Sequence, residues 1–196
     1  MLISMVKVGK QAALIVVDVQ NDFCPGGALP VPEGDKVVPV LNRYIEFFRS
    51  IGATILFTRD WHPMDHISFK TQGGIWPPHC IQNTWGAEFH PALKVGERDF
   101  IVSKGFERSR EAYSGFQGTD LDERLKRLNI KELFVGGLAT DYCVKNTVLD
   151  GLKRGYRVYL LEDAVRGVDV NEGDSLRAIE EMVKAGAVKI SFKDLE

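Results

Sequence analysis

The chain has 196 residues, 44% of them hydrophobic, which is enough for one domain with a single sizeable core. Its 25 basic and 27 acidic residues leave a net charge of −2, so the basic excess that binds a phosphate backbone is missing and nucleic acid is not expected as a partner. No apolar segment approaches the roughly twenty residues that span a bilayer, no cleavage site follows the N-terminal segment, and three cysteines do not suggest a disulfide framework. We therefore expect a single cytoplasmic domain over residues 1–196, and leave open whether residues 1–10 are ordered.

Six short apolar runs rich in β-branched residues predict six strands. The first run, residues 13–17, shows no alternation of polar and apolar residues, which is typical of a central parallel strand covered on both faces. The predicted strands are 13–17, 54–58, 100–103, 132–135, 158–161 and 188–190.

Segments with apolar residues at helical spacing alternate with these strands. The predicted helices are 37–51, 119–128, 142–154 and 173–185. This alternation indicates right-handed βαβ crossovers. We predict a doubly wound α/β fold, an open and mostly parallel six-stranded sheet with helices on both faces, which is a Rossmann-like three-layer sandwich. No G-x-G-x-x-G follows the first strand, so dinucleotide binding is not favoured.

The segment 61–97 has no regular period and carries all four histidines. An irregular segment of this length in a compact domain is usually functional. The segment is also longer than is needed to cover one pocket, so part of it could contact another subunit in a homo-oligomer.

Polar groups capable of chemistry follow four consecutive strands: Asp18, Asp60, Lys104 and, after a short turn, Cys143. Ligands of open α/β sheets bind beyond the carboxyl ends of the strands, so these side chains are expected to share one site. Cys143 lies where a strand turns into a helix, and the N–H groups and dipole of a helix start would lower the pKa of its thiol. The alternative is that Cys143 is a small buried hydrophobic residue.

A carboxylate, an amine and a thiol are a workable set for acyl transfer. We expect Asp18 to take the thiol proton of Cys143 and Lys104 to favour the ionised forms of both. The thiolate then attacks a carbonyl, and the backbone N–H groups of Ala139 and Cys143 are the candidate oxyanion hole. Asp18 returns its proton to the leaving amine, and water hydrolyses the thioester.

A metal site is a second possibility. Asp60 and His62 are two residues apart and share a side of an extended segment, and His79 follows two prolines that stiffen its approach. One carboxylate and two imidazoles suit Zn²⁺, Fe²⁺ or Mn²⁺. We interpret His66 and His90 as ordinary surface or capping residues, with His66 as a neighbour of the site.

Five motifs occur together in this chain: VDVQNDF at 17–23, TRDWHP at 58–63, WPPHC at 76–80, KG at 104–105 and GGLATDYCV at 136–144. In combination they resemble the nicotinamidases (pyrazinamidases) of the isochorismatase-like cysteine hydrolases, from about residue 14 to the end of the chain. The resemblance implies metal-dependent hydrolysis of nicotinamide to nicotinate and ammonia in NAD salvage, and of pyrazinamide to pyrazinoate.

The resemblance also implies roles for individual residues. It implies one divalent ion, with zinc expected ahead of iron or manganese, bound to the pyridine nitrogen through an open position. It implies a cis peptide bond between Leu138 and Ala139. The implied catalytic residues are Asp18, Lys104 and Cys143, the metal ligands Asp60, His62 and His79, and the pocket walls Phe23 and Trp85. Ala139 and Tyr142, next to the nucleophile on the same turn, are further candidates for substrate contact.

Two other functions are compatible with the fold. One is hydrolysis of another small amide or of isochorismate, for which the resemblance implies no metal site. The other is a non-catalytic binding domain that keeps the fold. Cys24 and Cys80 are interpreted as small packing residues, and Cys80 adjoins the candidate ligand His79.

Overall fold

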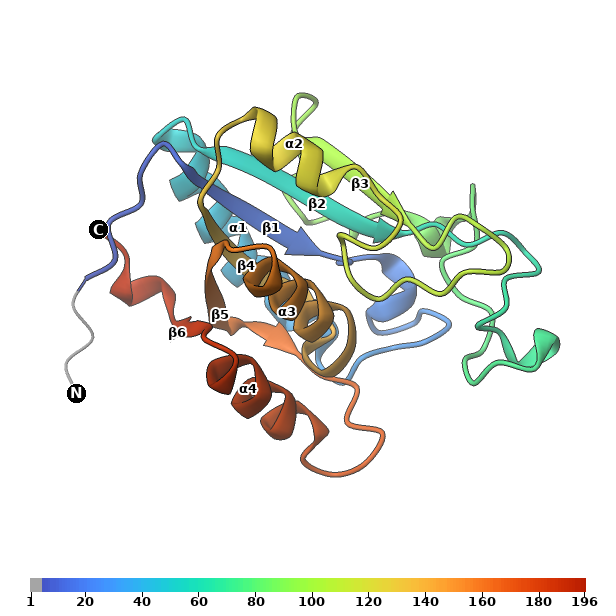
Figure 1. Cartoon of the computed structure of the whole chain (residues 1–196). Coiled ribbons are helices and arrows are strands. Elements are labelled where there is room, and N and C mark those ends of the chain that lie inside the picture. Colours follow the sequence, from blue (N-terminus) through green and yellow to red (C-terminus); the bar gives the residue numbers. More distant parts are fainter. Residues whose placement is uncertain (1–4) are drawn as a thin grey trace.

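The computed structural model describes residues 5–196 and contains one six-stranded sheet with helices on both sides (Figure 1). The strand order is β3-β2-β1-β4-β5-β6, and every pairing is parallel. The strands are β1 (Ala12–Val17), β2 (Thr54–Asp60), β3 (Phe100–Lys104), β4 (Glu132–Leu138), β5 (Arg157–Arg166) and β6 (Val188–Ile190). The predicted doubly wound α/β fold is confirmed, and the sheet is parallel throughout.

Helix α1 (Val37–Ser50) covers one face of the sheet, and α2 (Leu121–Arg127), α3 (Lys145–Lys153) and α4 (Asp174–Lys184) cover the other. All six residues of β1 are buried. Leu14 and Val16 pack in the core under α1, while Ile15 and Val17 pack in the core under the other three helices. This burial on both faces explains why the first strand shows no polar alternation.

The predicted helix 142–154 begins later than expected. Thr140–Val144 forms a π-helical turn, and the α-helix proper starts at Lys145. The Ala139 carbonyl accepts the N–H groups of Tyr142 and Val144, each at 3.1 Å. Cys143 therefore lies inside a wide turn between β4 and α3. π-Helical turns of this kind are frequent at functional sites.

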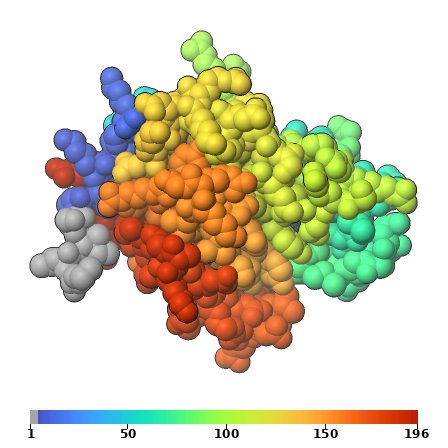
Figure 2. Space-filling model, viewed as in Figure 1, coloured from blue at the N-terminus to red at the C-terminus, as the bar shows by residue number. Residues whose placement is uncertain are grey.

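The irregular segment 61–97 lies beyond the carboxyl ends of the strands, and in Figure 2 its green surface forms one end of the molecule beside the yellow-green connection that follows β3. The buried side chain of Gln20 ties this segment to the sheet. Its amide nitrogen donates to the carbonyls of Asp60 (2.8 Å) and Ala87 (3.0 Å), and its amide oxygen accepts the Asp60 N–H at 2.8 Å. Two of these bonds fix the end of β2, and the third ties Ala87 of the irregular segment to it.

At the opposite end of the molecule the first and last described segments pair, where Val6 bridges to Leu195. The sequence left open whether residues 1–10 are ordered. Of these, residues 1–4 lie outside the described residues. Within residues 5–196, no helix combines the length and the apolarity needed to cross a bilayer.

Gly137 controls how closely β4 approaches β1. Its φ is +125°, and a Cβ at this position would overlap the backbone of Val17.

We predict that Gly137→Ala lowers the free energy of unfolding by more than about 3 kcal/mol, because a strained backbone and a clash with main-chain atoms add together. Gly155→Ala is the matched control, since Gly155 also has a positive φ (+86°) but open space around its Cβ position. It should cost only about 1 to 2 kcal/mol. Urea denaturation measures both, and equal losses would contradict this account of the β1–β4 approach.

Candidate active site

The structure brings the three predicted catalytic side chains together. Asp18 directly follows β1, Lys104 ends β3, and Cys143 lies in the turn after β4. The Lys104 Nζ lies 2.7 Å from Asp18 Oδ2 and donates to Cys143 Sγ at 3.4 Å. All three residues are buried, with at most 6% of their surface exposed.

Lys104 is also bonded to two further groups. Its ammonium lies 2.5 Å from Asp60 Oδ1 and donates to the Ala112 carbonyl at 3.2 Å. On the other side, Thr58 Oγ1 donates to Asp18 Oδ1 at 2.6 Å. A fully buried lysine is tolerated only when its charge is paired, and here two carboxylates pair with it.

Burial and neighbouring charges set the protonation of this cluster. Burial alone would lower the pKa of Lys104, but Asp18 and Asp60 raise it well above its ordinary value, so the ammonium stays charged. Burial raises the pKa of Asp18, against the opposing effect of Lys104. For Asp60, burial acts to raise the pKa, but Lys104 and the nearby imidazoles of His62 and His79 hold it below its usual value. The carboxylate of Asp18 is therefore the better proton acceptor of the two.

The expectation that a helix start lowers the pKa of Cys143 is wrong for the protein without substrate. Burial raises the pKa of this thiol well above its ordinary value, and Asp18 and Asp60 add to the rise while Lys104 opposes it. Burial is the largest of these effects, so the thiol keeps its proton until a base takes it.

The predicted metal ligands also converge. Ligand atoms of Asp60, His62 and His79 all lie within 4.8 Å of one another, and His79 Nε2 is 3.9 Å from Asp60 Oδ2. Backbone carbonyls accept hydrogen bonds from both Nδ1 atoms. His62 Nδ1 donates to the His79 carbonyl at 3.1 Å, and His79 Nδ1 donates to the Pro77 carbonyl at 2.7 Å. Both Nε2 atoms are thereby left for an ion, the arrangement in which metal-bound histidines are usually held.

The His62 side chain adds a direct indication of a cation. Its Nε2 is buried and has no hydrogen-bond partner within residues 5–196. A buried polar atom without a partner is costly, and an ion removes that cost. Burial also lowers the pKa of His62 to about 4, so the imidazole is neutral, as a ligand must be. The donor set of one carboxylate and two imidazoles fits a divalent ion such as zinc.

Two other groups of ligand-type side chains fit an ion less well. Asp18, Asp60 and Cys143 are close enough, but the Lys104 ammonium already lies among them. His66 groups with His62 and Glu111. However, both ring nitrogens of His66 are already bonded, one to Ser68 Oγ and one to the Arg110 carbonyl.

His66 is a neighbour of the site, as expected, but it is fully buried and is not a surface residue. Its ring stacks on that of His62 with centroids 4.2 Å apart. His90 acts as a local cap, since its Nδ1 accepts the Ala92 N–H at 3.2 Å.

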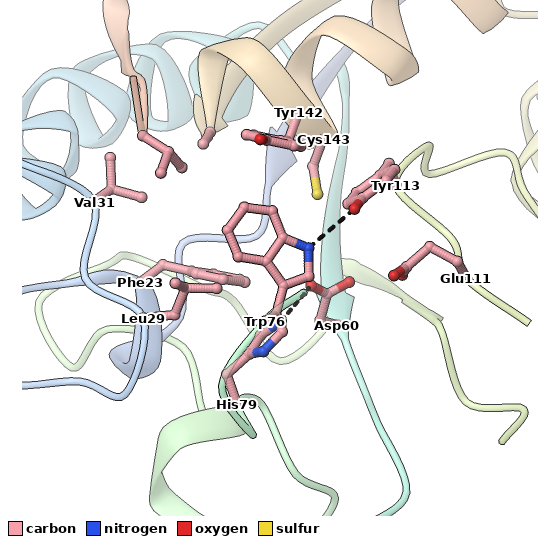
Figure 3. Close-up of a pocket in the computed structure, with 12 residues that line it drawn as sticks. Phe23, Leu29, Val31, Asp60, Trp76, His79, Glu111, Tyr113, Tyr142 and Cys143 are labelled. Atoms are coloured by element: carbon pink, nitrogen blue, oxygen red, sulfur yellow. Dashed lines mark hydrogen bonds and ion pairs between the residues drawn. The ribbon is translucent and has the colours of Figure 1, made fainter. Parts of the chain in front are cut away.

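A cavity with about 410 Å³ of empty space, part of it open to solvent, lies in front of Cys143 (Figure 3). Aromatic and aliphatic side chains form most of its wall, and the polar residues Asp60, His79 and Glu111 face it from one side. It is lined by Phe23, Leu29, Val31, Asp60, Trp76, His79, Glu111, Tyr113, Ala139, Tyr142, Cys143 and Val168. Of the residues expected to contact substrate, Phe23, Ala139 and Tyr142 line this cavity.

The prediction that Trp85 forms a wall of the pocket is wrong. Trp85 is 58% exposed and is absent from the cavity lining. Asn21 Nδ2 donates to its backbone carbonyl at 2.8 Å. Trp76 forms the wall instead. Its Nε1 donates to Tyr113 Oη at 3.0 Å, and its ring meets Tyr142 edge to face at 5.0 Å.

Sequence reasoning missed Trp76, Tyr113 and Glu111. A signal for Trp76 was present, because the two prolines that fix His79 directly follow it and restrict it as well. Tyr113 and Glu111 lie in a polar connection without periodicity, and no local pattern singled them out.

The peptide bond between Leu138 and Ala139 is cis, as the resemblance implied. Ala139 and Cys143 both line the cavity, so the turn that carries the two candidate oxyanion amides faces the space in front of the thiol. Their role as donors to an oxyanion stays a prediction.

The chain is similar to known proteins over nearly its whole length. The isochorismatase domain family model matches residues 12–194. The nicotinamidase of Escherichia coli is 44% identical over 94% of this chain and 96% of its own. The pyrazinamidase of Pyrococcus horikoshii, solved in complex with zinc, is 53% identical with a TM-score of 0.89 over 93% of this chain and 99% of its own. PnC1 from L. infantum, solved in complex with nicotinate, is 33% identical with a TM-score of 0.90 over 98% of both chains.

The buried Lys104 ammonium leads to a prediction about stability. Lys104→Met leaves Asp18 and Asp60 buried without their cation, so we expect the free energy of unfolding to fall by about 3 to 5 kcal/mol. Lys126→Met is the matched control, because Lys126 pairs with Asp122 on the surface, where its side chain is 67% exposed. It should cost less than about 1 kcal/mol. Denaturant unfolding of the two variants measures the difference, and losses of similar size would contradict the assigned charge pairing.

Proposed function

This chain belongs to the isochorismatase family, and we propose that it is a metal-dependent cysteine amidohydrolase that converts nicotinamide to nicotinate and ammonia, and pyrazinamide to pyrazinoate. The observation that carries the proposal is the adjacency of two sites. A buried acid, ammonium and thiol lie beside two imidazoles whose Nε2 atoms are left free by backbone bonds, and both sites share Asp60.

The cavity suits a flat aromatic amide. Phe23, Trp76 and Tyr142 offer rings against which a pyridine or pyrazine ring can pack. Cys143 and His79 both line this space and lie on different sides of it (Figure 3).

The reaction begins with Asp18, whose raised pKa suits a group that both accepts and donates protons. Asp18 takes the proton of the Cys143 thiol when the substrate amide is in place, and the thiolate attacks the amide carbon. The Lys104 ammonium, 3.4 Å from the sulfur, stabilises the negative charge that develops there. The backbone N–H groups of Ala139 and Cys143 bind the oxyanion.

Asp18 then donates its proton to the leaving amine, ammonia departs, and the acyl group remains on Cys143 as a thioester. Water attacks the thioester with Asp18 again as the base, the C–S bond breaks, Asp18 returns the proton to the Cys143 sulfur, and the carboxylate product leaves. Asp60, His62 and His79 would hold the ion, which supplies a Lewis acid that orients the ring through its nitrogen and draws electron density from it.

The alternative functions account for less of the site. Hydrolysis of another small amide or of isochorismate leaves the three converging metal ligands without a role. A binding domain without catalysis leaves the buried Asp18, Lys104 and Cys143 without a role, at the energetic cost of burying charge.

We further propose that the reaction is a salvage step for NAD, because nicotinate is its product. We also propose that residues 1–196 form a single catalytic domain. A cytoplasmic location is supported by the three cysteines, all free and buried. The homo-oligomer expected from the length of segment 61–97 stays a prediction.

Cys143→Ala should lower ammonia release from nicotinamide by at least about a thousandfold, because the attacking atom is removed. Cys24→Ala is the matched control: it removes another buried thiol, one that does not line the cavity, and should retain activity. A coupled ammonia assay under saturating nicotinamide measures both. Activity that survives in Cys143→Ala would contradict the proposed nucleophile.

Removal of the metal should abolish turnover. After dialysis against a chelator we expect less than about a tenth of the initial rate, restored by stoichiometric zinc. His62→Ala should not regain activity at that zinc concentration, whereas His90→Ala, which changes a histidine outside the cluster, should respond like the unaltered protein. Full activity in chelator-treated protein with no metal by elemental analysis would refute the metal requirement.

A further inference from the structure

Glu111 lines the cavity but has no part in the chemistry described above. Its carboxylate points into the cavity on the side of Asp60 (Figure 3). A carboxylate oxygen of Glu111 lies within 4.8 Å of a ring nitrogen of His62 and within the same distance of one of His66. Glu111 thus faces the histidine that carries the buried, unpartnered Nε2.

The backbone on both sides of Glu111 is fixed by the site itself. The carbonyl of Arg110 is bonded to His66 Nε2 at 3.0 Å, and the carbonyl of Ala112 accepts from Lys104 Nζ at 3.2 Å. The Glu111 side chain starts between these two anchors. Its position is therefore set by the same buried groups that define the catalytic and metal sites.

The charge of Glu111 lacks a counterion. Within residues 5–196 it forms no ion pair with a lysine, arginine or histidine, and the hydrogen bond that its carboxylate accepts comes from the neighbouring Ala112 N–H at 3.1 Å. The carboxylate of Asp60 lines the same cavity. Two carboxylates that face one partly enclosed space repel each other unless a cation lies between them.

The imidazoles near Glu111 are held by other groups. The ring nitrogens of His66 are bonded to Ser68 and to the Arg110 carbonyl, and His62 Nδ1 is bonded to the His79 carbonyl. Lys104 points to Asp18 and Asp60. The cation that Glu111 faces is then the ion of the Asp60, His62 and His79 site.

We propose that Glu111 positions the divalent ion by accepting a hydrogen bond from a water ligand at the ion's open coordination position, and so raises the affinity of the protein for the ion. Sites with three protein ligands keep such a position for water or substrate. Groups that bond the ligands of a metal from outside its coordination sphere contribute about tenfold to a hundredfold in metal affinity. The inference rests on the metal site of the proposed function and does not depend on which amide is hydrolysed.

The test measures zinc affinity directly, by competition with a chromogenic chelator on the whole chain. Glu111→Gln keeps the size of the side chain and removes its charge, and we expect zinc to bind at least about tenfold more weakly. Cobalt is the second probe, because its visible absorption reports coordination without any turnover, and the spectrum of Glu111→Gln should differ from that of the unaltered protein. Thermal unfolding of the metal-free variant verifies that it folds.

Glu107→Gln is the matched control. Glu107 belongs to the same connection after β3, pairs with Arg110 at 3.7 Å on the surface, and does not line the cavity. Its zinc affinity should remain unchanged. Equal zinc affinities in Glu111→Gln and the unaltered protein would overturn the proposal, and so would equal losses in both glutamine variants, which would indicate a general effect of charge. A protein that fails to hydrolyse nicotinamide but loses zinc on Glu111→Gln would refute the proposed substrate and keep this inference.

Discussion

The ammonium of Lys104 is the interaction on which the site depends. It lies fully buried between the carboxylates of Asp18 and Asp60 and within hydrogen-bond reach of the Cys143 sulfur. Without it, two carboxylates would face each other in a space that excludes water, and one would take up a proton. Because the ammonium already pairs with one oxygen of Asp60, the other oxygen is left for the metal side. One lysine thus separates the proton-transfer half of the site from the metal half.

The parallel sheet supplies the geometry that this lysine needs. Asp60 and Lys104 are directly paired in the register of β2 and β3, and Asp18 follows β1, the neighbouring strand on the other side of β2. A backbone φ of +48° at Asp18 turns the chain out of the strand at that point. Because carboxyl ends of adjacent parallel strands lie at the same edge, residues more than 40 positions apart meet with little freedom. Cys143 arrives from β4 on the other side of β1, so the site spans the centre of the sheet.

Much of this arrangement could be predicted from the sequence, because a charged residue that follows a buried parallel strand lies at the carboxyl edge of the sheet. The same logic could not position the residues of the irregular segments. Trp85 was expected in the pocket and lies outside it, whereas Trp76 lines it. Glu111 gave no signal at all, because its place is set by bonds of its neighbours to Lys104 and His66. The pKa of Cys143 was also missed, because it depends on burial that the sequence does not specify.

Lys104 supplies the positive charge among Asp18, Asp60 and Cys143, so the metal must bind on the histidine side. Ligand atoms of Asp18, Asp60 and Cys143 are close enough to hold an ion themselves if the lysine moves away. Anomalous diffraction at the zinc edge, from crystals of the zinc-loaded protein, decides between these arrangements. The account predicts one peak bonded to His62 Nε2, with Lys104 still between the two carboxylates. A peak bonded to the Cys143 sulfur, with the lysine displaced, would contradict it.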